Sequence, residues 1–365
     1  MPVDVTNFGE AKHYSLSNAE QTLVVKITDY GATITHILVP DKTGTTRDVV
    51  LGFDSLEGYR STINPYFGAT IGRVGNRIGG GQFELNNTTY KLDLNNGPNC
   101  LHGGLIGFDK RYWTSRITGS NSVEFSLMSD DGDQNFPGAL QVVVVYIVVG
   151  HELHINYEAR LSSSETKSTV INLTNHAYFN LGGASDESTS KITDNFIAMS
   201  NSVVGYLEKD NNGMGGVPTG NVIDFRTSDV ATDPMYFGNG KGVKIGSRID
   251  QAQGQCYDHC YVIGLRHDER PLVTAWSEST GIKLTFDTSE PSFQFYSGDY
   301  NSDQLRAKTS QRGTKNEVEL GPRSGFCLEA QRFPDAIHHD DWRSQVILNP
   351  GQLYEQRTVY GFGLI

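Results

Sequence analysis

A carboxylate inside an apolar segment near residue 330 is the first candidate for chemistry. Glu329 lies in the sequence Gly325-Phe-Cys-Leu-Glu-Ala-Gln331 and shares one face of this period-2 segment with Cys327 and Gln331. A carboxylate in such a place is either paired with a structural cation or held partly out of water with a raised pKa, which suits a general base. Four arginines of the chain could supply the structural pairing: Arg73, Arg77, Arg323 and Arg332. The residues alone leave both interpretations open.

Side chains that donate and accept hydrogen bonds gather in a second segment, Val170–Leu181. If this segment is a strand, its residues alternate between two faces, and one face is apolar apart from Asn175. The other face carries amide, hydroxyl, imidazole and phenol groups: Asn172, Thr174, His176, Tyr178 and Asn180. A solvated face usually carries Lys and Glu, whereas these groups suit the hydroxyls of a sugar. The face is therefore either ordinary and solvated or the lining of a polar, concave site.

Residue patterns for several other chemistries are missing from the sequence. No G-x-x-x-x-G-K-[ST] phosphate loop and no G-x-S-x-G nucleophile turn is present. His151 and His154 have the wrong spacing for a zinc protease motif, and in the hairpin expected there they face opposite ways. Cys256 and Cys260 lack the second ligand pair of a zinc site, so we expect buried thiols. We therefore predict no bound metal and no cofactor.

Short strands are the elements that must position these candidates. Period-2 segments separated by turn-forming clusters recur along the chain: Leu23–Thr28, Ala32–Val39, Gln82–Leu85, Tyr112–Ile117, Val123–Leu127, Leu140–Val149, Leu153–Leu161, Thr169–Leu181, Tyr261–Ile263, Ile282–Thr288, Phe293–Ser297 and Gly325–Gln331. Gly150-His151 joins two of them as a hairpin, and Ser55–Ser61 is the best candidate for a helix. We predict an all-β fold, a large antiparallel β-sandwich with few short helices. No linker or repeat interrupts the pattern, so we expect one domain over residues 1–365.

The composition is that of a globular protein with an acidic surface. The chain has 365 residues, with 30 Lys and Arg against 42 Asp and Glu, and a formal net charge of −12. This balance argues against nucleic acid or an anionic membrane surface as the partner. The longest apolar run, Val142–Val149, is far shorter than the ~20 residues of a membrane helix. No secretory signal is visible and the four cysteines fit reduced thiols, so we expect a cytoplasmic location.

Two segments carry a resemblance to a known family: Thr174-Asn-His-Ala-Tyr-Phe-Asn-Leu181 and Gly325-Phe-Cys-Leu-Glu-Ala-Gln-Arg-Phe-Pro-Asp-Ala336. Further pieces match in the expected order: Gly72–Ile78, Cys100–Gly104, Tyr257–Tyr261 and Phe293–Gly298. Together they resemble the aldose 1-epimerase (galactose mutarotase) family from about Val24 to Gly363. The departures are small: Gly75, Ala177 and Ala330 stand where Ala, Ser and Thr are common.

The resemblance implies a galactose mutarotase-like β-sandwich that interconverts the α and β anomers of free hexoses such as galactose and glucose. This reaction opens the hemiacetal, turns the C1–C2 bond and closes the ring on the other face of the carbonyl. A base takes the proton of the C1 hydroxyl and an acid protonates the ring oxygen, so no cofactor or metal is required. By resemblance, Glu329 is the base, His176 is the acid, and His102 is a second imidazole near the ring oxygen.

The same resemblance assigns the sugar-binding role to further residues, besides His102: Asn76, Arg77, Tyr178, Asp258 and Gln294. A planar guanidinium suits two adjacent hydroxyls, and a carboxylate accepts hydrogen bonds from vicinal hydroxyls. Structural alternatives stay open for each. Arg77 could brace the turn at Gly79–Gly81, and Asp258 could pair with Arg266 or Arg270. Gln294 and Tyr178 could be ordinary strand residues.

Two other functions compete with epimerisation of free hexoses. An epimerase of hexose 6-phosphates would require a cationic cluster around C6, for which the matched residues supply only Arg77. A non-catalytic sugar-binding module could use the same scaffold without Glu329 or His176, and both are present. We expect a small-molecule sugar as the partner, no nucleic acid or membrane partner, and a monomer or weak dimer.

Overall fold

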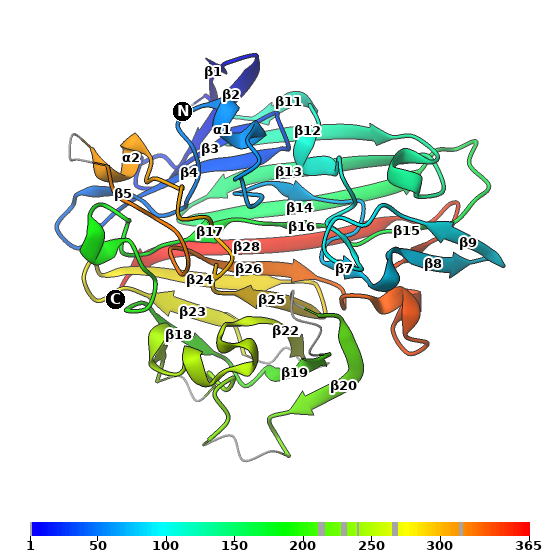
Figure 1. The fold of residues 1–365 in the computed structure, drawn as a ribbon. Coiled ribbons are helices and arrows are strands. Elements are labelled where there is room, and N and C mark those ends of the chain that lie inside the picture. Colours follow the sequence, from blue (N-terminus) through cyan, green and yellow to red (C-terminus); the bar gives the residue numbers. More distant parts are fainter. Residues whose placement is uncertain (1, 211–215, 228–231, 239–240, 265–268, 314–316) are drawn as a thin grey trace.

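Strands and short connections make up most of the molecule (Figure 1). The computed structural model describes residues 2–210, 216–227, 232–238, 241–264, 269–313 and 317–365. The strands form a nine-stranded, a six-stranded and a five-stranded sheet, together with several two-stranded pairs. The predicted all-β architecture with few short helices is therefore confirmed.

The nine-stranded sheet forms one layer of the sandwich. Its strands lie in this order: β11 (Thr114–Gly119), β12 (Ser122–Ser129), β13 (Leu140–Val149), β14 (Glu152–Leu161), β28 (Tyr354–Leu364), β24 (Ile282–Thr288), β23 (Val273–Trp276), β18 (Phe196–Met199) and β21 (Val243–Lys244). The hairpin expected at Gly150-His151 is present, with Val149 of β13 paired to Glu152 of β14. Alternate residues of β13 are buried, because one face of this sheet covers the core.

The six-stranded sheet carries residues of both the core and the predicted site. Its strands lie in this order: β17 (Tyr178–Phe179), β26 (Phe326–Gln331), β25 (Ser292–Tyr296), β22 (Asp258–Ile263), β19 (Val203–Lys209) and β20 (Pro218–Asp224). β25 and β26 are buried along their whole length. Phe293, Phe295 and Leu328 belong to the core. Since side chains alternate along a strand, Glu329 projects from the opposite face.

The remaining strands come largely from the N-terminal third of the chain. The five-stranded sheet consists of β1 (Asp4–Phe8), β2 (Ala11–Ser17), β3 (Val24–Thr28), β4 (Thr33–Pro40) and β5 (Thr46–Asp48). The two-stranded pairs are β6 (Thr70–Ile71) with β16 (Thr174–Asn175), β7 (Arg77–Ile78) with β10 (Cys100–Leu101), β8 (Gln82–Leu85) with β9 (Thr88–Lys91), and β15 (Thr169–Val170) with β27 (Ile347–Leu348).

Among the described residues, two short α-helices are found, α1 (Leu56–Arg60) and α2 (Thr309–Arg312), besides short 3-10 turns. The helix expected over Ser55–Ser61 is confirmed as α1, whose two caps are Ser55 and Ser61. Nothing in the sequence pattern indicated α2. Within the described ranges, no helix has the length and apolar character needed to cross a membrane.

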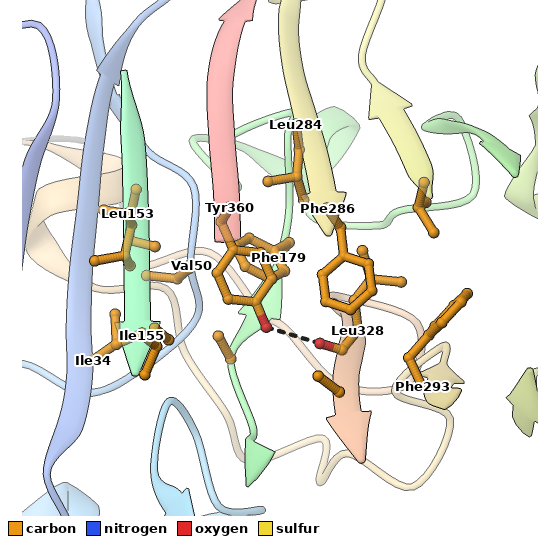
Figure 2. Close-up of a cluster of buried hydrophobic side chains, with 14 of the residues drawn as sticks. Ile34, Val50, Leu153, Ile155, Phe179, Leu284, Phe286, Phe293, Leu328 and Tyr360 are labelled. Atoms are coloured by element: carbon orange, nitrogen blue, oxygen red, sulfur yellow. Dashed lines mark hydrogen bonds between the residues drawn. The ribbon is translucent and has the colours of Figure 1, made fainter. Parts of the chain in front are cut away.

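Apolar side chains from both large sheets meet in one core (Figure 2). The ring of Tyr360 on β28 lies 5.0 Å from that of Phe179 on β17 and 5.6 Å from that of Phe286 on β24, centroid to centroid. Its hydroxyl donates a hydrogen bond of 2.8 Å to the carbonyl oxygen of Leu328 on β26. This bond satisfies a buried hydroxyl and links the two sheets. The backbone directly before Glu329 is thereby fixed.

The prediction of one strand over Thr169–Leu181 is wrong. The segment forms three two-residue strands, β15, β16 and β17, and each pairs with a different partner. Side-chain amides compete with the strand ladder here. Asn172 exchanges hydrogen bonds with the backbone of Arg332, and Asn175 accepts from the amide of Ala177. The chain therefore changes partners twice within this segment.

The other predicted strands are found within two residues of the expected bounds, apart from Tyr261–Ile263. The strand at that position, β22, begins at Asp258. Its first residues are polar, so the apolar pattern showed only its end. The difference matters because it places Asp258 inside the sheet rather than in a loop.

Candidate active site

A cavity of about 200 Å³ lies over the polar face of the six-stranded sheet. Every residue predicted for the site lines it: Asn76, Arg77, His102, His176, Tyr178, Asp258, Gln294 and Glu329. Residues that the sequence analysis did not select complete the wall: Pro65, Tyr66, Asn96, Leu101, Tyr296 and Tyr300. The fold thus brings together residues from distant parts of the chain, whose roles remain predictions.

The floor of the cavity is set by strand register. Gln294 on β25 pairs with Glu329 on β26, and Tyr296 pairs with Asp258 on β22. Tyr178 on β17 lies opposite Cys327 on β26. Directly paired residues of antiparallel strands project from the same face, so these side chains form one polar surface.

Glu329 and His176 form the centre of this surface. The Glu329 Oε2 atom lies 3.5 Å from the Nε2 atom of His176, and both side chains are buried. Among the described residues, Oε2 of Glu329 has no hydrogen-bond partner. A buried carboxylate oxygen without a partner, facing a cavity, is an acceptor available to a ligand.

The pKa values of this pair move in opposite directions. Burial, and next the negative charge of Asp258, raises the pKa of Glu329 well above its ordinary value. Arg77 and Lys209 act against this rise. Burial lowers the pKa of His176 to about 4. Burial therefore disfavours the charged form of both groups, and the two groups titrate as a coupled pair.

His102 lies beside this pair. Its ring centroid is 5.1 Å from that of His176, and its Nδ1 atom accepts a hydrogen bond of 3.1 Å from the backbone N–H of Asn76. Burial, with the neighbouring His176, lowers the pKa of His102 well below its ordinary value. A neutral ring whose Nδ1 is an acceptor carries its proton on Nε2. In this tautomer His102 offers an N–H donor at Nε2, and a share in the acid role stays a prediction.

A network of polar contacts holds the other side of the cavity. The Asp258 carboxylate accepts a 2.6 Å hydrogen bond from Gln294 and lies 3.2 Å from the Lys209 ammonium and 3.9 Å from Arg77. Although burial raises its pKa, the charges of Lys209 and Arg77 and the Gln294 bond together hold the pKa of Asp258 well below its usual range. The side-chain amide of Asn76 donates a hydrogen bond of 3.2 Å to the side-chain oxygen Oε1 of Gln294. Asp258 is thus a permanent acceptor.

Three cavity residues have backbone conformations that side chains rarely adopt. Tyr66, Asn76 and His102 have φ values of 67°, 58° and 53°. Such left-handed residues outside glycine concentrate at functional sites, where the surrounding structure holds them. At these positions an aromatic ring, an amide and an imidazole line the same cavity. No periodic sequence pattern indicates such left-handed turns.

The structural alternatives for the arginines do not account for Glu329. Arg73 donates to the carbonyl oxygens of Pro137 and Gly138, Arg323 pairs with Asp299, and Arg332 pairs with Glu290. Each of these side chains thus has other partners. This arrangement favours the interpretation of Glu329 as a desolvated carboxylate over that of a structural ion pair.

The structural role considered for Arg77, bracing the turn at Gly79–Gly81, is not found either. The Arg77 guanidinium donates to Asn96 at 2.9 Å and lies near Asp258, whereas the backbone N–H of Gly79 is bonded by Asp335. Arg77 therefore does not brace the glycine turn through its side chain.

One of the two arginines proposed as partners of Asp258, Arg270, pairs with a different carboxylate, that of Asp287. The other, Arg266, lies outside the described residues. The cation that pairs with Asp258 most closely is Lys209, which the sequence analysis missed. Lys209 stands between Glu208 and Asp210, so it resembles part of an exposed charged run and gives no signal of its position.

The polar face expected in Val170–Leu181 reaches the site only in part. His176 and Tyr178 line the cavity, with their rings stacked 5.0 Å apart. Asn172 and Asn180 are buried elsewhere, where they bond the backbone of Arg332 and Ser324. The face is therefore neither solvated nor a continuous lining.

His102, His176 and Glu329 each offer one ligand atom, and these atoms lie within 4.8 Å of one another. Within the part of the chain that the structure describes, no other group of three such residues could hold a metal ion. Ligation through Nε2 of His102 would require this atom to lose the proton that its tautomer carries. The donor set therefore fits hydrogen bonding to a sugar better than coordination of a metal.

Comparisons with known proteins agree with the geometry. The family model for aldose 1-epimerase matches residues 12–361. Galactose mutarotase from Bos taurus is 38% identical over 342 residues, which cover 94% of this chain and 92% of that protein. Galactose mutarotase from Homo sapiens is 36% identical over the same shares.

Solved structures show the same fold. The GalM/aldose epimerase homologue from C. elegans has a TM-score of 0.83 at 28% identity, with 97% of this chain and 99% of that chain covered. The galactose 1-epimerase from Lactobacillus acidophilus has a TM-score of 0.79 at 24% identity, with 100% and 99% covered. On the strength of the family match across its length and of these relatives, the chain belongs to the aldose 1-epimerase family.

Proposed function

We propose that this protein is an aldose 1-epimerase that interconverts the α and β anomers of free hexoses such as galactose and glucose, in hexose and galactose metabolism. The observation that carries the proposal is the buried pair of Glu329 and His176, 3.5 Å apart at the floor of a small polar cavity. Relatives named galactose mutarotase support the choice of galactose as a substrate.

Glu329 and His176 divide the proton transfers in this mechanism. The Glu329 carboxylate accepts the proton of the C1 hydroxyl, the C1–O5 bond breaks as C1 becomes a carbonyl, and His176 gives its proton to O5. Rotation about C1–C2 then presents the other face of the carbonyl. Reclosure reverses both transfers, so protons and charge balance without a cofactor or a metal.

His102 supports the ring oxygen in this scheme. Its Nε2–H donates into the cavity next to His176. A second donor at this oxygen stabilises the charge that develops while the ring opens. Whether His102 also shares the proton is decided by comparing the pH profiles of His102 and His176 variants.

The rest of the sugar is held by five polar side chains: Asp258, Arg77, Asn76, Gln294 and Tyr178. Asp258 accepts from ring hydroxyls, and Arg77 and Asn76 donate to them. Because Asp258, Gln294, Asn76 and Arg77 belong to one network of contacts, the sugar stays in place while C1 turns.

The cations near the cavity favour a free hexose over a hexose 6-phosphate. Arg77 and Lys209 both lie within 4 Å of Asp258, which offsets one of their two positive charges. A phosphate would need positive charge that is not compensated in this way. A purely sugar-binding role is disfavoured because both proton-transfer groups are in place.

Polarimetry tests the proposal. Freshly dissolved α-D-galactose and α-D-glucose should reach their equilibrium rotation faster with the protein than without it. EDTA should leave this acceleration unchanged, because the mechanism uses no metal. A rotation change at the spontaneous rate would leave only the sugar-binding function.

The predictions of a cytoplasmic location and of a monomer or weak dimer are separate, and sedimentation velocity checks the oligomeric state.

A further inference from the structure

Four polar residues form a row across four adjacent strands of the six-stranded sheet. Tyr206 on β19 pairs with Tyr261 on β22, and three residues farther along β19 the ammonium of Lys209 lies 3.2 Å from the carboxylate of Asp258, the first residue of β22. The next strand contributes Gln294, which bonds Asp258 and pairs with Glu329 on the strand after it. Lys209 is thus connected to the proposed base through Asp258 and Gln294.

The Lys209 ammonium is nearly enclosed by protein. Its side chain is 10% exposed, and its Nζ atom lies 3.2 Å from Oδ2 of Asp258. An ammonium group taken out of water is unfavourable unless a carboxylate compensates it. Lys209 is not among the residues that line the cavity. It therefore has no direct contact with a sugar there and acts through Asp258.

We propose that Lys209 is a positioning residue of this site: its ammonium group partly offsets the charge of Asp258, so that Asp258 opposes ionisation of the base Glu329 less strongly. This inference rests on the proposed function for the role of Glu329. Arg77, the other cation near Asp258, lies farther away at 3.9 Å and also donates to Asn96. Lys209 is therefore the principal counter-charge.

The direction of the effect follows from the charges around Glu329. Its titratable and charged neighbours are Arg77, His102, His176, Tyr178, Lys209, Asp258, Cys260, Cys327 and Tyr360. Asp258 raises the pKa of Glu329, while Arg77 and Lys209 lower it. Loss of the Lys209 charge leaves Asp258 less compensated, so protons bind the Glu329–His176 pair more tightly.

The pH dependence of kcat/KM, measured by polarimetry, tests this proposal. Lys209→Met removes the charge and keeps most of the side-chain length. Its bell-shaped profile should move to higher pH, acidic limb included, by roughly 0.5–1 pH unit. Lys209→Gln is a second neutral variant, which should shift the profile in the same direction if Lys209→Met does not fold. Lys209→Arg keeps the charge, so its profile should stay at the wild-type position.

A control variant separates this effect from a general change in surface charge. Lys244 is an exposed lysine paired with Asp194, and neither residue lines the cavity, so Lys244→Met should shift neither limb. A fall in kcat/KM that is uniform over pH in the neutral Lys209 variants would show a merely structural role and overturn the proposal.

Infrared titration keeps this test independent of turnover. The carboxylic acid C=O band that is absent in Glu329→Gln reports the protonation of Glu329 directly. In Lys209→Met this band should persist to higher pH than in the wild type, and an unchanged midpoint would contradict the proposal. If the wild type does not accelerate mutarotation, the proposed function fails, while the band still decides whether Lys209 controls Glu329.

Discussion

Glu329 owes its chemical character to its place in the sheet. Its neighbours Leu328 and Ala330 belong to the core, and the carboxylate itself is buried beside His176. Burial favours the neutral form of both groups, which raises the pKa of one and lowers that of the other. In the proposed mechanism the pair accepts one proton and gives another, so its total charge does not change.

The binding residues should differ from this pair in their kinetic effect. Arg77→Ala removes a charged donor, so we expect KM to rise about 10–100-fold with a smaller fall in kcat. Asp258→Asn should act in the same direction. Initial rates of mutarotation over a range of galactose concentrations measure both constants, and Arg306→Ala, at a surface ion pair with Glu319, is the control. A fall in kcat at constant KM would instead place Arg77 in the proton transfer.

The sequence could indicate the site residues only where a local pattern exposes them. Glu329 is conspicuous because it interrupts an apolar strand, and His176 and Tyr178 because they share the polar face of Val170–Leu181. The others were found through the family resemblance. Neither the local sequence pattern nor the family resemblance identified Lys209 or Tyr66. The position of Lys209 follows from the pairing of β19 with β22, and that of Tyr66 from a left-handed turn, neither of which has a sequence period.

At the scale of elements, short strands that change partners place the acid. His176 lies between β16, which pairs with β6, and β17, which pairs with β26. Period-2 alternation predicts which residues share a face, but it does not predict which strand each strand pairs with. For this reason the expectation of one continuous strand over Thr169–Leu181 was wrong, although the faces of His176 and Tyr178 were right.

The connection between β24 and β25 should make the stability of the fold depend on pH. Burial raises the pKa of Glu290 to about 7 despite Arg332 at 3.4 Å. The folded state thus binds this proton more tightly than the unfolded chain, so stability is present at low pH and is lost as pH rises through about 7. Glu290→Gln should match the wild type near pH 5 and exceed its free energy of unfolding by roughly 1–3 kcal/mol at pH 8.

Urea unfolding of both proteins at the two pH values measures this difference. A Glu290→Gln variant that is less stable than the wild type at pH 8 would show that the ion pair with Arg332 outweighs the burial of the carboxylate. An equal loss of stability at both pH values would indicate a packing defect instead.

At the scale of the whole molecule, distant parts of the chain are interleaved. β28, near the C-terminal end of the chain, lies between β14 and β24 in the nine-stranded sheet (Figure 1). The core contains residues from Val3 to Phe362. The class of fold was predictable from the dense strand pattern, whereas the order of strands was not, because these pairings join residues far apart in sequence.

This interleaving supports the expectation of one domain over residues 1–365. We predict a single cooperative transition in calorimetry, with equal calorimetric and van't Hoff enthalpies. Far-UV and near-UV circular dichroism should follow the same transition. Two separate transitions would show that part of the chain folds independently.

The kinetics of Glu329→Gln test the central claim most directly. Glutamine keeps the size and the acceptor oxygen of the side chain but not its basicity, so kcat should fall by roughly 10²–10⁴ with little change in KM. The acidic limb of the kcat/KM profile should disappear, and His176→Asn should lower kcat similarly. A correctly folded Glu329→Gln variant that retains most of the wild-type kcat would contradict the account, and His102 would then be the next residue to mutate.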